Sequence, residues 1–75
     1  MRGPAVSRGL AMPWSTDYYP KAMEHLSAEV RAKAIEIANA LLAEGDDEGM
    51  AIRVGIARAK QWGARRGIPV SDREF

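Results

Sequence analysis

The chain has 75 residues, 47% of them apolar, and thirteen of the apolar residues are alanines. It is therefore expected to form one small domain, whose modest core must come from helix packing. The absence of cysteine and the single histidine exclude a disulfide framework and the usual structural zinc sites. A net charge of +1 gives no general attraction to nucleic acid or to acidic membranes.

The hydropathy of the chain gives no sign of a membrane protein. No apolar run reaches the roughly 18 residues that a transmembrane helix requires. The first residues also lack the apolar region of a secretory signal. These features predict a soluble, cytoplasmic protein without membrane insertion.

The N-terminal part of the chain begins with a stretch that favours no regular structure. Residues 1–13 contain glycines, prolines and two arginines without a periodic apolar face, which predicts a disordered tail. Pro20 has the fixed φ that suits a first helical position, and no breaker follows directly. A short helix is therefore expected at about 20–25.

Two longer helices are predicted next, over about 28–44 and about 47–66. The short acidic connection between them allows only an antiparallel hairpin, so the expected fold is all-α. In the first of these helices one arc of about 160° is apolar at 100° per residue, and it is expected to face the core. That arc comprises Ile37, Val30, Leu41, Ala34, Ala38, Leu42 and Ile35. The expected caps are Ser27, Gly45, and Asp46 or Asp47.

The chain after the second long helix reads as a further tail. Gly67 and Pro69 are residue types that commonly follow the C-terminus of a helix, so residues 68–75 are expected to form a loose tail. Ile68 and Val70 are the two residues of this segment that can fold back onto the helices. The single helical domain is accordingly expected over residues 14–67.

Small residues recur every fourth position in the second long helix, at Ala51, Gly55, Ala59 and Gly63. A glycine inside a helix costs roughly 1 kcal/mol relative to alanine, so it usually has a packing reason. The favoured interpretation is close packing of the two long helices within one chain, and the alternative is the seam of a homodimer. Leucine at either glycine should overpack the contact, whereas alanine is expected to be mild.

The segments MPW from Met12, DYYPKAMEHL over 17–26 and EVRAKAIEIANALL over 29–42 resemble the ChaB-like family of short bacterial proteins. The resemblance covers about residues 12–62, and the shorter acidic loop and residues 1–11 depart from it. It implies a small helical protein without catalytic residues and a proposed role in regulating a cation transporter. It also makes Met12 an alternative start. The positions that carry it are Trp14, Tyr19-Pro20, Asn39 and Trp62.

Catalytic and metal-binding groups are scarce. His25 is the one imidazole, it lies beside a helix cap, and no serine occurs in a nucleophile motif. The acidic segment 44–49 has the wrong spacing for a calcium loop, so its carboxylates are interpreted as helix caps. No enzymatic activity, metal or cofactor is expected.

The second long helix also carries a basic face. Arg53 with Lys60, and Arg58 with Arg65, form two rows at i, i+7 on the side away from the small residues. The candidate partner surface consists of these residues and one apolar neighbour: Arg53, Val54, Arg58, Lys60 and Arg65. Three interpretations are open, namely a solvated face, an acidic protein or membrane-protein partner, and nucleic acid.

Four aromatic residues are expected to complete the small core, with an interface as the alternative: Trp14, Tyr18, Tyr19 and Trp62. Taken with the basic face, these features predict a non-catalytic cytoplasmic interaction or regulatory protein. Its expected partner is a protein, such as the cytoplasmic face of a membrane transporter, and it is expected to be a monomer or a weak homodimer. The alternative function is a small nucleic-acid-binding protein that uses the same basic face.

Overall fold

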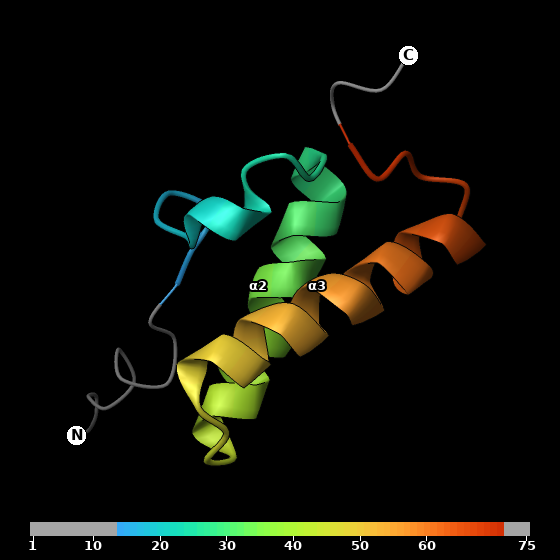
Figure 1. Cartoon of the computed structure of the whole chain (residues 1–75). Helices are drawn as coiled ribbons and strands as arrows, with labels where there is room; N and C mark the ends of the chain where they lie inside the picture. The colour runs from blue at the N-terminus through green and yellow to red at the C-terminus, as the bar shows by residue number, and fades with distance from the viewer. Residues whose placement is uncertain (1–13, 72–75) are drawn as a thin grey trace, which may run out of the picture.

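The computed structural model describes residues 14–71, so the disorder predicted for 1–13 and the last part of the predicted tail, 72–75, lie outside this range. Two α-helices form an antiparallel hairpin, α2 over Ala28–Ala43 and α3 over Glu48–Arg65. They pack along each other and are joined by the short connection at the lower end of Figure 1. No strand occurs within residues 14–71, which confirms the all-α class and the hairpin.

The segment predicted as a short helix at 20–25 is a single turn of 3-10 helix, η1, over Lys21–Met23. The N–H groups of Met23 and Glu24 donate to the carbonyls of Pro20 and Lys21, which closes this turn. Three residues are too few to form an α-helix that is stable by itself. Met23 is fully buried, so the turn serves to place one core side chain over the N-terminal end of α2.

Both long helices begin at the predicted caps. The side chain of Ser27 accepts a hydrogen bond from the Val30 amide, and that of Asp47 accepts one from the Met50 amide at 2.8 Å. These bonds satisfy backbone donors that have no partner inside the helix. The acidic connection is thus used, through Asp47, to start α3.

Both helices also end in the same motif, with a glycine in the left-handed region. Gly45 has φ 104° and Gly67 has φ 71°. After α2 the Asp46 amide donates to the Leu41 carbonyl, and after α3 the Ile68 amide donates to the Gly63 carbonyl at 2.9 Å. These are the hydrogen bonds of a Schellman cap, which requires a residue that tolerates positive φ.

The small-residue face of α3 packs on α2 within the same chain. Ala51, Gly55, Ala59 and Gly63 are all buried. A Cβ atom at Gly55 would lie 3.0 Å from the Ala34 carbonyl oxygen, and one at Gly63 would lie 2.9 Å from Val30 Cγ2. The close contact between the helices confirms the favoured interpretation and leaves this face unavailable for a homodimer seam. The same distances predict a tighter fit for alanine at these positions than the sequence alone suggests.

The core lies between the two helices and the chain segments that cover their open end. Its largest fully buried side chains are Met23, Leu26 and Val30. Most of the predicted apolar arc of α2 is confirmed, because Val30, Ala34, Ile35 and Ala38 are buried and Leu41 and Leu42 pack against them. Ile37 is only half-buried, since it lines the groove between the two helices beside Trp62.

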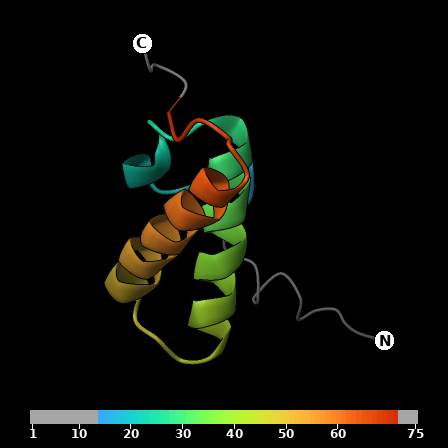
Figure 2. The same cartoon turned by 90° about the vertical axis from the view of Figure 1, so that its right-hand side faces the viewer.

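Residues 68–71 pack against the domain, so the loose tail expected over 68–75 does not begin at residue 68. Ile68 and Val70 contact the core, and the Ser27 amide donates to the Val70 carbonyl at 2.7 Å. Leu26 and Ser71 form an antiparallel bridge. Figures 1 and 2 show the segment after α3 running back past the N-terminal end of α2. The packed unit therefore extends beyond the predicted boundary at 67.

Candidate interaction surface

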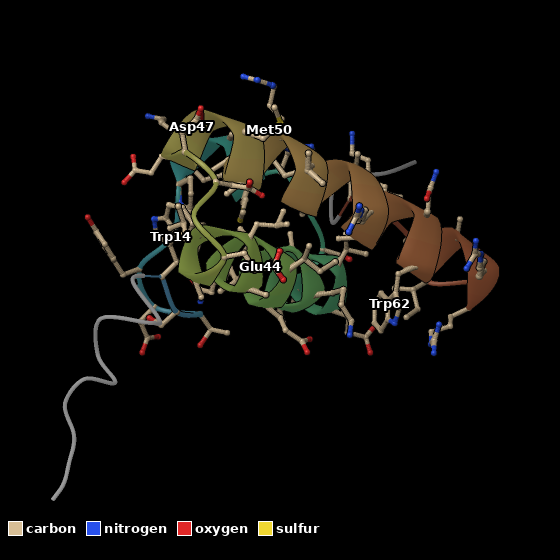
Figure 3. The ribbon with its side chains drawn as sticks, turned by 90° about the horizontal axis from the view of Figure 1, so that it is seen from below. Trp14, Glu44, Asp47, Met50 and Trp62 are labelled. Carbon is tan, nitrogen blue, oxygen red and sulfur yellow. The ribbon has the colours of Figure 1, made fainter. Side chains whose placement is uncertain are left out.

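The predicted partner surface lies on the side of α3 that faces away from α2. Arg53, Arg58, Lys60 and Arg65 are exposed, and Val54 is half-buried. Figure 3 shows Met50 on this same outer side of α3. The helix therefore has an inner face of small residues, which closes the hairpin, and an outer face that is mostly exposed. Arg58 lies at the edge of this outer face, in a groove that Glu44 also lines.

The cations of the outer face lie in two rows rather than in one cluster. Arg53 and Lys60 form one row and Arg58 and Arg65 the other, and they flank a strip of less polar residues. This strip consists of Met50, Val54, Ala57, Gln61 and Ala64, of which all but Val54 are exposed. Met50 is 44% exposed, and together with Tyr18 it makes up the exposed large hydrophobic side chains of residues 14–71.

The electrostatic character of this surface is uniform. No acidic residue occurs between Gly49 and Ser71. Within residues 14–71, none of the four cations forms an ion pair, whereas Lys33 and Glu36 of α2 do so at 3.0 Å. The outer face of α3 thus presents four cations without an ion pair in the described part of the chain, and Arg58 is the one that shares a groove with Glu36 and Glu44.

Trp62 occupies the edge of α3 beside α2, where two cations lie over its ring. Lys33 Nζ is 5.1 Å and Arg66 Cζ 4.9 Å from the ring centroid. Figure 3 shows Trp62 on the side of α3 toward α2. A groove of about 400 Å³ runs from Trp62 between the helices to Glu44. The ring is half-buried and contacts residues of both helices, so Trp62 mainly stabilises the packing of the hairpin.

The other aromatic residues divide between core and surface. Trp14 is buried and Tyr19 packs against the core, as expected. Tyr18 is 72% exposed, which contradicts its assignment to the core. It lies in a tight turn that is closed by reciprocal backbone hydrogen bonds with Ser15.

Two polar residues have structural roles that the sequence analysis does not predict. Arg31 donates to the carbonyls of Met23, Glu24 and Leu26 at 2.8 to 3.3 Å, and its guanidinium lies over the Tyr19 ring. Asn39 is buried and pairs with the backbone of Trp14. The sequence does contain one indication of the role of Arg31, because this arginine lies on the same helix face as the apolar residues Ile35, Ala38 and Leu42.

The residues considered for chemistry are not brought together. His25 is exposed, and Asp47 is committed to the cap of α3. Residues 14–71 contain no group of three His, Cys, Asp or Glu side chains that could hold a metal ion. Neither α2 nor α3 is long and apolar enough to cross a membrane.

One curated relative shares much of this sequence. It is the uncharacterized protein YdaT of Bacillus subtilis (strain 168), which is 49% identical over 51 residues. The match covers 68% of this chain but only 34% of the relative, so the chain spans about a third of the length of that protein. No family model matches the chain, and no solved structure matches it. The resemblance to the ChaB-like family therefore stays a hypothesis.

Proposed function

We propose that this protein is a non-catalytic cytoplasmic interaction module that binds a protein partner through the outer face of α3. The observation that carries the proposal is the pairing of two opposite faces on one helix. The inner face is buried against α2 by its small residues, so the orientation of α3 is fixed. The outer face is left with four unpaired cations around an exposed Met50.

A protein partner is favoured over nucleic acid by the composition of this surface. Its central strip contains Met50, Val54 and two alanines, which are suited to apolar contacts with another protein. No aromatic side chain lies between the rows for base stacking, because Trp62 is turned toward α2. The ChaB-like resemblance supports a regulatory role, with the cytoplasmic face of a membrane transporter as one class of partner.

Site-specific photo-crosslinking in the source cells tests the proposal. A crosslinking amino acid is placed at Gln61, which is exposed on the outer face of α3, or at Ala32, which is exposed on α2 and serves as the matched control. We expect protein adducts from Gln61 that survive nuclease treatment, and far fewer from Ala32. Adducts that disappear with nuclease, or equal adducts from both positions, would contradict the proposal.

A fourfold charge reversal completes this test: Arg53→Glu, Arg58→Glu, Lys60→Glu and Arg65→Glu. All four side chains are exposed, so the helical circular dichroism of the variant should be retained. The adducts from Gln61 should be lost in this folded variant. The alternative result concerns duplex DNA. If the wild-type chain bound DNA with micromolar affinity at physiological salt, and the fourfold variant bound it less tightly, the function would be nucleic-acid binding.

A further inference from the structure

The central strip of the outer face has the spacing of a coiled-coil seam. Met50, Val54, Ala57, Gln61 and Ala64 follow one another at intervals of four, three, four and three residues. This alternation places the a and d positions of a heptad in one line along a helix. Val54 and Gln61 then occupy a positions, and Met50, Ala57 and Ala64 occupy d positions. We call these five residues the outer seam.

The same heptad assigns a place to every cation of the candidate surface. Arg53 and Lys60 fall at g positions, and Arg58 and Arg65 fall at e positions. In a coiled coil these two positions flank the seam and face the partner helix, where their charges decide which helix is accepted. The flanks of the outer seam are therefore uniformly positive.

A uniform charge on both flanks disfavours a second copy of this chain as the occupant. Parallel pairing would set g positions against e positions, and antiparallel pairing would set e against e and g against g. Each arrangement places cations of one chain beside cations of the other. No acid of the strip or of its flanks on α3 relieves this repulsion, because none occurs between Gly49 and Ser71.

We propose that the outer seam binds an amphipathic α-helix of a partner protein that carries Glu or Asp on both sides of its apolar stripe. This inference rests on the proposed function and specifies the partner of that surface. Ala57 and Ala64 leave room for a partner helix to approach closely, with its larger side chains filling the space above them. Gln61, a polar residue at an a position, is suited to set the register of the pair.

The length of the seam indicates a weak and reversible interaction. From Met50 to Ala64 the helix rises about 21 Å, which corresponds to roughly two heptads. Small side chains at two of three d positions bury little apolar area. Recognition therefore depends strongly on the four flanking charges, and the affinity should fall as salt is added.

Two synthetic helices test the proposal with the full chain. Both peptides have about three heptads with leucine at a and d, and they differ only in glutamate or lysine at e and g. Fluorescence anisotropy at low ionic strength is expected to show binding of the glutamate peptide that is at least about tenfold tighter than that of the lysine peptide. The fourfold charge reversal should exchange this preference, so that the lysine peptide is now bound.

A substitution pair locates the binding on the seam. Ala57→Asp places a like charge in the centre of the surface that the glutamate peptide covers, so it should abolish binding while the circular dichroism is kept. Ala32→Asp adds the same charge at an exposed position of α2 and should leave the affinity within about twofold. Loss of binding in both variants would show that overall charge, not the seam, drives the interaction, and would overturn the proposal.

The outcome separates this inference from the function on which it rests. Equal affinity for both peptides, or an unchanged preference after charge reversal, would refute an acidic helix as the partner. If Gln61 still crosslinked a cellular protein in that case, the interaction function would stand and only the nature of its partner would be wrong. Absence of specific protein adducts from Gln61 would instead remove the function and the inference together.

Discussion

The side chain of Asn39 and the backbone of Trp14 form a reciprocal pair of hydrogen bonds across 25 residues of sequence. Asn39 Nδ2 donates to the Trp14 carbonyl at 3.0 Å, and the Trp14 amide donates to Asn39 Oδ1 at 3.3 Å. Asn39 is 4% and Trp14 8% exposed. The carboxamide thus satisfies both backbone polar groups of Trp14 and attaches this residue to α2.

Replacement of Asn39 by alanine should destabilise the protein by about 2 kcal/mol. The change leaves two backbone groups of Trp14 without partners in a buried place, where each unpaired group costs about 1–3 kcal/mol. The measurement is urea unfolding followed by circular dichroism. Glu36→Ala serves as the control, because it removes only an exposed side chain of the same helix and its surface ion pair with Lys33, which should cost about 0.5 kcal/mol or less. A difference between the variants of less than about 0.5 kcal/mol would show that these hydrogen bonds contribute nothing.

Gly63→Ala should also destabilise the protein, although alanine is the better helix former. Its Cβ would lie 2.9 Å from Cγ2 of Val30, a stiff β-branched side chain that is fully buried, so one of the two helices has to shift. Overpacking of this kind costs about 1–3 kcal/mol. Gly49→Ala is the control, because its nearest neighbours are two side-chain atoms at 3.6 Å.

A double-mutant cycle identifies the cause of the Gly63 effect. Val30→Ala removes the methyl group that the new Cβ would meet, so it should be less damaging in the Gly63→Ala background than in the wild-type chain. The coupling free energy from chemical unfolding should be about 1 kcal/mol. If the free-energy changes of the two substitutions were additive, the helices would not be in close contact between Gly63 and Val30.

Arg31→Lys should loosen the segment before α2 even though the charge is kept. The guanidinium donates to three carbonyls at 2.8 to 3.3 Å and lies over the Tyr19 ring at 4.8 Å. An ammonium group cannot reproduce this planar arrangement of donors. Hydrogen exchange at Met23 and Leu26 should accelerate by about tenfold, while amides in the middle of α3 change less. Uniform acceleration throughout the domain would indicate loss of global stability instead.

The sequence predicts those features of the fold that depend on neighbouring residues. Ser27 and Asp47 start the two helices, and Gly45 and Gly67 end them, because caps are set by side chains within a few positions. The small-residue face of α3 was predicted by its spacing of four. Helical periodicity alone also decides which residues share a side of α3, so the sequence predicts that the cations of the candidate surface lie together.

The remaining features depend on partners far along the chain. Asn39 is buried because Trp14, 25 residues earlier, supplies its hydrogen bonds, and no local pattern indicates this pairing. Residues 68–71 fold back because Val70 meets the Ser27 amide at the open end of the hairpin. The segment expected as a short helix at 20–25 is one turn, and its Met23 and Glu24 carbonyls accept hydrogen bonds from Arg31 of α2. Tertiary contacts override local preference in each case.

The two faces of α3 can be compared directly by thiol reactivity, because the chain has no cysteine of its own. Single cysteines replace Ala57 and Ala64 on the outer seam, and Ala51 and Ala59 on the inner face. The two outer positions are exposed, whereas Ala51 and Ala59 are 0% exposed. The reaction rate with a thiol reagent is measured in the folded protein, with and without the glutamate peptide.

The outer thiols should react at rates close to that of an unfolded peptide and should be slowed by the glutamate peptide. The inner thiols should react slower by about two orders of magnitude or more in both conditions, because their reaction requires the hairpin to open. Inner thiols that react as fast as the outer ones would contradict the fixed orientation of α3. Outer thiols that the peptide leaves equally reactive would contradict its binding at the seam.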